Sequence, residues 1–298
     1  MTVSTATKAI QLTAASERLT LDPFRDIDWN IEVRDDSTFH LPPDKLPLYG
    51  TTQWERMTDA ERRTYSRHEC ASLSAAGIWF ENKLMQIVLR HLADLPVTDP
   101  SHRYLLVEIA DECRHSTMFG EYIRRAGTPT YAPRGANELG EVDQLPGGRA
   151  MGYLLILAVE ELLDVCNRAT MRDETIHPVS RQIAKIHVLE EARHLSFAKT
   201  FLLNTWPTLP SDERAEAAAL APDAVGYVAD LMVNADVYRE LGIEDGAAAA
   251  RANPAHRTRI VNDLAKLVAF LEELGVIDDT TRSAWVERGL TGHPRSAS

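Results

Sequence analysis

Two stretches of this chain share a motif that could bind metal ions. Glu112 and His115 are three residues apart, and Glu191 and His194 repeat that spacing 79 residues later. Residues i and i+3 of an α-helix lie on the same face, so each pair can hold one ion together. The doubled Glu-x-x-His motif therefore predicts a metal site built from two helices.

Two further glutamates stand at matching distances from the two motifs. Glu81 precedes Glu112 by 31 residues, and Glu160 precedes Glu191 by the same interval. A helical hairpin of that length brings both members of each pair to nearly the same level, at a rise of about 1.5 Å per residue. Two such hairpins give the six-ligand set of the ferritin-like di-iron and di-manganese bundles.

A third histidine lies on the stripe of the second motif. His187 precedes Glu191 by four residues and His194 by seven, so it could join the site as a seventh ligand. Glu108 occupies the equivalent position in the other half, as a bridging or outer group. A metal-bound histidine donates its second N–H to a carboxylate or carbonyl. The carboxylates that we assign to this outer role are Asp111, Asp164 and Glu190.

The ligand types favour iron or manganese over other metals. Carboxylates combined with imidazoles suit both ions, and four glutamates would balance the charge of two divalent cations. Iron is favoured if the site activates oxygen. The residue after His187 is a valine and the chain has no His-Glu-x-x-His motif, which argues against a zinc protease.

Caps and prolines mark the helices that must position these residues. Thr58 and Glu61 fit a capping box, Gly127 suits the position after a helix, and Pro178 suits a first turn. The predicted helices cover residues 59–93, 101–126, 149–175, 178–205, 211–240 and 254–274, with a short one at 280–289. Five glycines and three prolines predict a crossover loop over residues 127–149. With strand signals almost absent, we predict an all-α, ferritin-like four-helix bundle with extra C-terminal helices.

The rest of the chain includes an N-terminal segment, and its composition limits the kinds of partner and the location that we expect. Residues 1–20 read as a flexible arm and residues 21–56 as an irregular segment, within a single domain over 1–298. A net charge of −12 argues against nucleic acid as a partner. The longest apolar run, Met151–Val159, is too short to span a membrane, and three scattered cysteines suggest a reducing, cytoplasmic location.

The sequence around these residues resembles the para-aminobenzoate N-oxygenase family of diiron enzymes. The resemblance covers about residues 26–205 well and the C-terminal third loosely. The segments that carry it are Leu48–Thr51, Ser66–Glu69, Gly77–Glu81, Glu108–Phe119, Glu160–Asp164 and Ile186–His194.

The resemblance implies a homodimer that activates O2 at a His-rich diiron site. Family metal ligands match Glu81, Glu112, His115, Glu160, His187, Glu191 and His194. Diferrous iron in the family binds O2 as a bridging peroxo species, which oxygenates an arylamine through hydroxylamine and nitroso stages to a nitro product of secondary metabolism. We expect an external electron donor because the chain has no flavin or nicotinamide fingerprint, and no catalytic residue beyond the metal site.

The substrate and the reaction subclass stay open at this stage. Family members that act on carboxylated arylamines use a basic residue, for which Arg257 and Arg259 are candidates. Leu73, Gly77 and Asn167 are candidates for lining a pocket. The alternatives to an amine N-oxygenase are another diiron oxidase, such as a C–H hydroxylase or desaturase, and a ferritin-like iron or manganese protein, including a manganese catalase.

Overall fold

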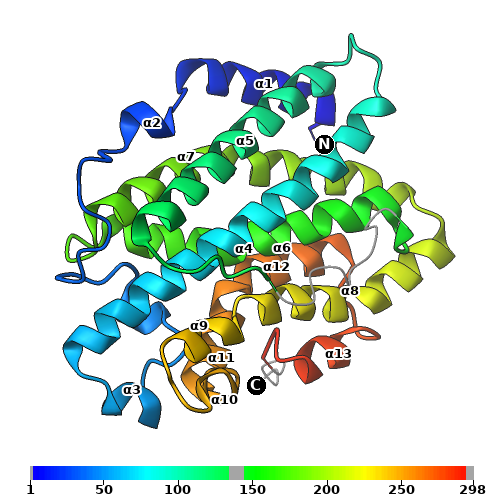
Figure 1. The fold of residues 1–298 in the computed structure, drawn as a ribbon. Coiled ribbons are helices and arrows are strands. Elements are labelled where there is room, and N and C mark those ends of the chain that lie inside the picture. Colours follow the sequence, from blue (N-terminus) through cyan, green and yellow to red (C-terminus); the bar gives the residue numbers. More distant parts are fainter. Residues whose placement is uncertain (1–2, 134–143, 293–298) are drawn as a thin grey trace.

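A computed structural model of the chain describes residues 3–133 and 144–292 (Figure 1). In these two ranges the regular structure is helical, apart from a one-residue bridge between Phe39 and Ile176. The predicted all-α class is confirmed. The predicted crossover loop over residues 127–149 lies partly outside the described residues, since 134–143 belong to neither range.

Four long helices make up the bundle, and they lie side by side in Figure 1. They are α4 (Asp59–Ala93), α5 (Pro100–Ala126), α6 (Gly148–Arg172) and α7 (Pro178–Thr205). The α4–α5 and α6–α7 pairs are antiparallel hairpins with the most extensive packing in the molecule. All four predicted helices are present, and their ends agree with the prediction to within three residues.

Local signals fix where these helices begin and end. The Thr58 side chain accepts a hydrogen bond from the backbone N–H of Glu61, and the Glu61 carboxylate accepts one from the backbone N–H of Thr58. This reciprocal capping box satisfies two backbone donors at the start of α4. Gly127 ends α5 with φ of +63°, a conformation that glycine adopts without steric cost.

Helix α6 forms the centre of the core. Its residues from Ala150 to Asp164 are all buried, because α4, α7, α8, α11 and α12 pack around it. The apolar run Met151–Val159 is therefore core sequence. Within the described ranges, no helix is both long and apolar enough to cross a bilayer.

The N-terminal segment is more ordered than we expected. Helix α1 (Thr5–Arg18) packs against α5 and α7 with Ala9 fully buried, so the predicted flexible arm is wrong for these residues. This helix has few large apolar residues, so its amphipathic pattern was too weak to predict a packed helix from the sequence. The next segment is irregular as predicted, with the short helices α2 (Pro23–Asp26), η1 (Pro43–Lys45) and α3 (Thr52–Arg56).

In the C-terminal third, two helices that were predicted as continuous are each divided into two in the structure. The expected helix over 211–240 is α8 (Ser211–Leu231) and α9 (Ala235–Glu240), because the Asn234 side chain caps α9 and also donates to the backbone oxygens of Tyr131 and Ala132. The expected helix over 254–274 divides at Leu264. The remaining helices are η3 (Trp206–Thr208), α10 (Gly246–Ala252), α11 (Pro254–Asp263), α12 (Ala265–Leu274) and α13 (Arg282–Glu287).

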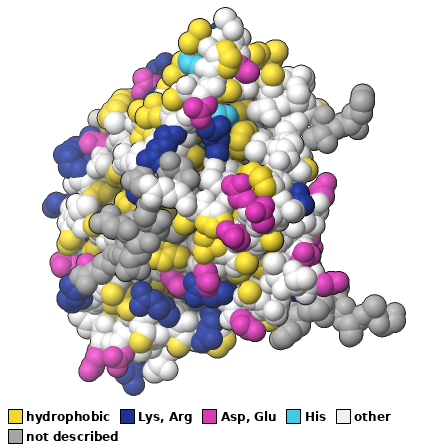
Figure 2. Space-filling view, turned by 90° about the vertical axis from the view of Figure 1, so that its right-hand side faces the viewer, with side chains coloured by type: hydrophobic (Ala, Val, Ile, Leu, Met, Phe, Trp, Pro, Cys, Tyr) yellow, Lys and Arg dark blue, Asp and Glu magenta, His cyan; other side chains and the backbone are white. Residues whose placement is uncertain are grey.

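One face of the molecule is shown in space-filling form in Figure 2. Acidic, basic and hydrophobic side chains are interspersed on it, without a continuous area of one charge sign among the residues shown in colour. The acidic excess of the chain is thus not concentrated on this face.

Candidate metal centre

All seven residues predicted as metal ligands meet in one buried cluster between the four long helices. Each of their side chains is at most 2% exposed. Helix α4 supplies Glu81, α5 supplies Glu112 and His115, α6 supplies Glu160, and α7 supplies His187, Glu191 and His194. The equal 31-residue intervals in the sequence thus correspond to two hairpins that present their polar residues at one level.

The two histidines of the repeated motif point the same ring nitrogen at the glutamates. Nδ1 of His115 lies 2.8 Å from a carboxylate oxygen of Glu112 and 3.2 Å from one of Glu191. Nδ1 of His194 lies 2.9 Å and 3.0 Å from oxygens of the same two glutamates. Glu112 and Glu191 therefore lie between both histidines, as carboxylates that bridge two ions would.

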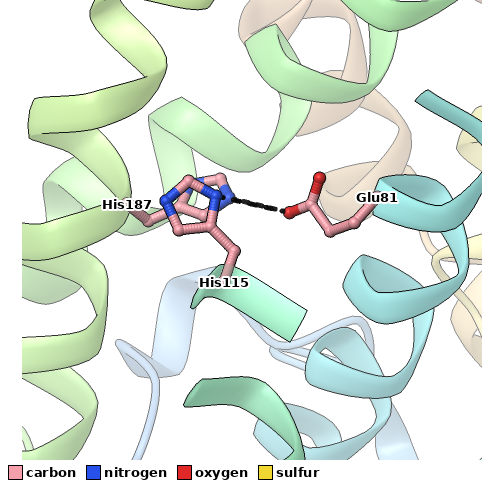
Figure 3. Close-up of side chains that lie close together, drawn as sticks. All are labelled: Glu81, His115 and His187. Atoms are coloured by element: carbon pink, nitrogen blue, oxygen red, sulfur yellow. Dashed lines mark ion pairs between the residues drawn. The ribbon is translucent and has the colours of Figure 1, made fainter. Parts of the chain in front are cut away.

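His187 lies beside His115, and both rings face Glu81 (Figure 3). Its Nε2 is 3.6 Å from Oε1 of Glu81 and 4.0 Å from Oε2 of Glu160. His115 Nδ1 is 3.8 Å from the same Glu81 oxygen. Candidate ligand atoms of Glu81, His115 and His187 all lie within 4.8 Å of one another. This spacing matches a set of atoms that could surround one cation.

Unpartnered polar atoms show that these residues fit metal ions. Among the described residues, six buried atoms of the cluster have no hydrogen-bond partner: both carboxylate oxygens of Glu81, Oε1 of Glu112, Oε2 of Glu160, Oε1 of Glu191 and Nε2 of His187. A buried polar atom without a partner costs free energy, and a buried unpaired charge costs more. Two divalent cations would give every one of these atoms a partner.

The pKa shifts of the cluster residues reflect the same cost of burying polar groups when no metal is bound. Burial, and then the neighbouring Glu112, raise the pKa of Glu81 well above its usual 4.5. Burial and Glu191 do the same for Glu160. Burial also lowers the pKa of His187 to about 4, so its ring is neutral at pH 7. A neutral imidazole is the form that binds a metal.

Two predicted outer carboxylates hold the histidines in a crossed arrangement. Asp111 on α5 lies 3.2 Å from Nε2 of His194 on α7, and Glu190 on α7 lies 2.9 Å from Nε2 of His115 on α5. Each carboxylate accepts the Nε2–H of the histidine on the opposite helix, so Nδ1 of each ring faces Glu112 and Glu191 and is the atom that could bind a metal. Such partners fix the tautomer and the orientation of a metal-binding ring.

Two arginines connect these carboxylates. Arg193 Nη2 is 3.1 Å from Asp111 and 3.7 Å from Glu190, and Arg114 pairs with the same two carboxylates. Burial acts to raise the pKa of Asp111, but His194 and the two arginines lower it below its usual value. Asp111 therefore stays ionised and can accept the N–H of His194.

The other two predicted outer carboxylates do not contact a ligand histidine. Asp164 pairs with Arg168 at 2.6 Å, and its Oδ1 has no partner in the described chain. Glu108 is buried with Oε2 unpartnered, and burial raises its pKa to about 8. Residues one helical turn from a ligand share its face, but side-chain length and direction decide whether they reach the next ring.

Asn167, predicted as a candidate for lining a pocket, is the outer contact of the third histidine. Its amide nitrogen lies 3.1 Å from Nδ1 of His187. Which amide atom faces the ring depends on how the side chain is turned, and an oxygen there would accept Nδ1–H while Nε2 binds an ion. The sequence holds a signal for this contact, since Asn167 follows Glu160 by two helical turns.

A cavity adjoins the cluster on the His187 side. Leu73, Gly77 and Asn167, the three candidates for pocket lining, all border it, and its volume is about 40 Å³. The Phe119 ring forms the wall next to the metal centre, with its centroid 5.5 Å from that of His187. A Cβ on Gly77 would lie 3.0 Å from this ring. Glycine is thus needed for Phe119 to pack where it does.

The two candidate basic residues have different environments. Arg257 is exposed and donates to the backbone oxygen of Ala252. Arg259 lines a second cavity, which lies beside the first, together with Lys45 and Glu69. Only Arg259 of the two therefore faces the interior.

Comparisons with known proteins match this architecture. A model of the family described as P-aminobenzoate N-oxygenase AurF matches residues 4–275. An uncharacterized Mycobacterium tuberculosis protein, MT0908, is 28% identical over 286 residues, which cover 86% of this chain and 84% of that protein. An uncharacterized Mycobacterium bovis protein, Mb0909, is 30% identical over 211 residues, or 68% of this chain and 62% of that protein.

A solved structure shows the same fold in a distant protein. An R2-like ligand-binding oxidase variant, with an aerobically reconstituted Mn/Fe cofactor, aligns with a TM-score of 0.50 at 12% identity. The alignment covers 91% of this chain and 94% of that one. At this identity the likeness concerns the fold alone, and it confirms the predicted ferritin-like bundle.

Proposed function

The chain belongs to the p-aminobenzoate N-oxygenase family, and we propose that it is a dimetal, O2-dependent oxygenase that acts on the amino group of an arylamine. The observation that carries the proposal is the set of seven buried side chains that converge between four helices, five of which have an unpartnered polar atom. A family match supports the reaction class, and the cluster supplies the ligands that this class needs. Two iron ions, with manganese as the alternative, would supply the activation of O2.

The protein's own residues would hold the ions and orient the substrate. His115 and His194 would bind through Nδ1, because Glu190 and Asp111 occupy their Nε2–H groups. His187 would add a neutral third imidazole. The small cavity beside His187 is lined largely by apolar side chains, and we propose that an aromatic amine approaches the centre from this side, with the cavity widening to admit the ring.

The proposed reaction has a fixed requirement for electrons and protons. Conversion of an amine and O2 to a hydroxylamine and water consumes two electrons and two protons. The O–O bond breaks, one oxygen atom is inserted into an N–H bond to form N–O–H, and the other leaves as water. Further oxidation of the hydroxylamine gives the nitroso and nitro levels. We propose an external electron donor, since the cluster in the described residues provides metal ligands and no further redox cofactor motif is present in the sequence.

Product analysis with labelled oxygen tests this proposal. The protein is loaded with Fe(II) without air and then mixed with p-aminobenzoate and ¹⁸O2 for a single turnover, in which the bound Fe(II) supplies the electrons, and the products are analysed by mass spectrometry. We expect hydroxylamine, nitroso or nitro products that carry ¹⁸O on nitrogen. Ring-hydroxylated product would support a C–H oxidase instead, and absence of any oxygenated product from a panel of arylamines would contradict the proposal.

Two histidine variants on the same helix provide the control. His115→Ala removes a proposed ligand and should abolish product formation. His102→Ala makes the same change near the start of α5, ten residues or about 15 Å from Glu112, the nearer of the two candidate ligands on this helix, at 1.5 Å per residue. It should leave product formation unchanged. Equal effects of the two substitutions would mean that product formation does not depend on the cluster.

A further inference from the structure

A further cavity lies between α4, α6 and α8. It is lined by side chains within the ranges 79–87 of α4 and 155–160 of α6 and by one side chain of α8, and its volume is about 30 Å³. The cavity beside His187 is lined on the same two long helices by side chains within 70–77 and 163–170. Among the described residues the two cavities have no lining residue in common. They therefore lie at different levels along α4 and α6.

The inner end of this cavity reaches the candidate metal centre. Glu160, one of the seven candidate ligands, lines it, is 2% exposed and has an unpartnered Oε2 in the described chain. Phe80 also lines it and directly precedes the candidate ligand Glu81. A small molecule in the cavity would therefore lie next to residues that we expect to hold the ions.

The outer edge of the cavity lies at the surface of α4. Trp79, Lys83 and Ile87 line it at intervals of four residues, so they share one stripe of the helix, and all three are partly exposed. The ammonium group of Lys83 lies 5.9 Å from the centroid of the Trp79 ring. Phe80 and Leu84, which are 6% and 3% exposed, line the cavity further inside. The cavity thus connects the surface of α4 with the buried cluster.

The lining of this cavity favours an apolar guest over water. Apart from Lys83, Glu160 and the indole N–H of Trp79, its lining side chains are hydrocarbon. A buried water needs two to four polar partners, whereas apolar cavities stay dry and take up guests such as xenon. The cavity beside His187 differs, because Ser74 and Asn167 bring a hydroxyl and an amide to its wall. Water or a polar group has partners there.

The volume of the cavity limits its guest to a very small molecule. One water molecule takes up about 30 Å³ in the liquid, which is close to the volume of this cavity. A molecule of one or two heavy atoms therefore fits, whereas an aromatic ring does not. O2 is a small, uncharged and apolar molecule, and the proposed reaction consumes it.

We propose that the cavity beside Glu160 is the entry and binding site of O2, separate from the side on which the amine approaches the centre. O2 enters at the stripe formed by Trp79, Lys83 and Ile87 and reaches the cluster beside Glu160. The amine and O2 then do not compete for one path. This inference rests on the proposed function, to which it adds the route of the second substrate.

Xenon binding tests the cavity without reference to turnover. Xenon resembles O2 in being small, uncharged and apolar, and its anomalous scattering locates it in crystals of the metal-free protein under xenon pressure. We expect a xenon atom between Leu155 and Val228 in the wild-type protein, with higher occupancy than in the cavity beside His187. Leu155→Phe places a larger side chain in the cavity and should remove this atom.

The rate of reaction with O2 tests the route. The Fe(II)-loaded proteins are mixed with O2 in the absence of amine and followed by stopped-flow absorbance, after their bound iron has been measured. Leu155→Phe should lower the second-order rate constant at least fivefold. The matched control is Leu162→Phe, because both leucines are on α6 and 5% exposed, and Leu162 lines only the cavity of Arg259 among those described. It should change the rate constant less than twofold.

A second blocking variant covers the case in which Leu155→Phe impairs folding or iron loading. Val228→Phe fills the cavity from α8, which carries none of the candidate ligands. It should remove the xenon atom and lower the rate constant in the same way. Rate constants that are unchanged in both blocking variants, or lowered equally in Leu162→Phe, would overturn the inference.

The outcomes also separate this inference from the proposed function. Absence of xenon from the wild-type cavity, or equal occupancy of the cavity beside His187, would overturn the O2 site. If the loaded protein still places ¹⁸O on the nitrogen of p-aminobenzoate, the proposed function stands although the inference has failed. If no arylamine is oxygenated but xenon binds and the blocking variants slow the reaction with O2, the reverse holds.

Discussion

Asp111→Asn should weaken metal binding by removing one charge behind His194. Asp111 is 2% exposed and accepts Nε2–H of His194 at 3.2 Å. Asparagine keeps the shape and the accepting oxygen but not the charge. Loss of such a partner typically costs 10–100-fold in metal affinity, which is about 1.4–2.8 kcal/mol because each tenfold is about 1.4 kcal/mol.

The matched control is the same substitution at Asp164. Asp164 is also 2% exposed, but its partner is Arg168 and not a ligand histidine. Competition with a chromophoric Fe(II) chelator, without air, gives both affinities, and circular dichroism checks the fold. We expect Asp164→Asn to change the affinity less than threefold. Equal losses at the two positions would mean that net charge near the cluster, and not the bond to His194, sets the affinity.

Three further predictions concern the third histidine, the protonation state of the cluster and the cavity wall. His187→Ala should reduce bound iron, measured by elemental analysis, from two ions per chain toward one; two retained ions with unchanged product would refute its role as a ligand. In the metal-free protein the folded state holds a proton on Glu81 that the unfolded state loses above about pH 4.5. The unfolding free energy of the metal-free protein, measured by urea denaturation, should therefore fall as the pH rises above about 4.5, and more than that of the loaded protein; equal slopes would contradict this. Gly77→Ala should destabilise the protein by about 1–3 kcal/mol, because the new Cβ would lie 3.0 Å from Phe119. Gly120→Ala, with nothing within 4 Å of its Cβ, should stabilise it by about 0.5–1 kcal/mol; similar effects in thermal denaturation would show that the Phe119 contact is unimportant.

The sequence predicts the bundle well because its signals are local. A capping box at Thr58 and Glu61, a proline at the start of α7 and a glycine after α5 each mark a helix end through contacts within a few residues. The meeting of six candidate ligands followed from spacing alone, because helix rise and hairpin closure convert equal intervals into equal levels. His187 lies on the same stripe, and its choice as the seventh rested also on the family resemblance. Their role as metal ligands remains a prediction.

Contacts between distant segments were not predictable in this way. Asn234 breaks the expected helix over 211–240 by bonding to backbone oxygens about a hundred residues away. Asp164 and Asn167 both follow Glu160 on α6, yet only Asn167 reaches His187. Helix periodicity gives the face of a residue, whereas its partner depends on side-chain reach and on the neighbouring helix.

The central claim is that the seven buried side chains hold two metal ions. The most direct measurement is the number of Fe(II) ions per chain after loading without air and removal of unbound iron. We predict two ions per chain for the wild-type protein and fewer for Glu112→Ala, because Glu112 lies between both histidines of the repeated motif. Binding of no iron, or of two ions that persist in Glu112→Ala, would contradict the account.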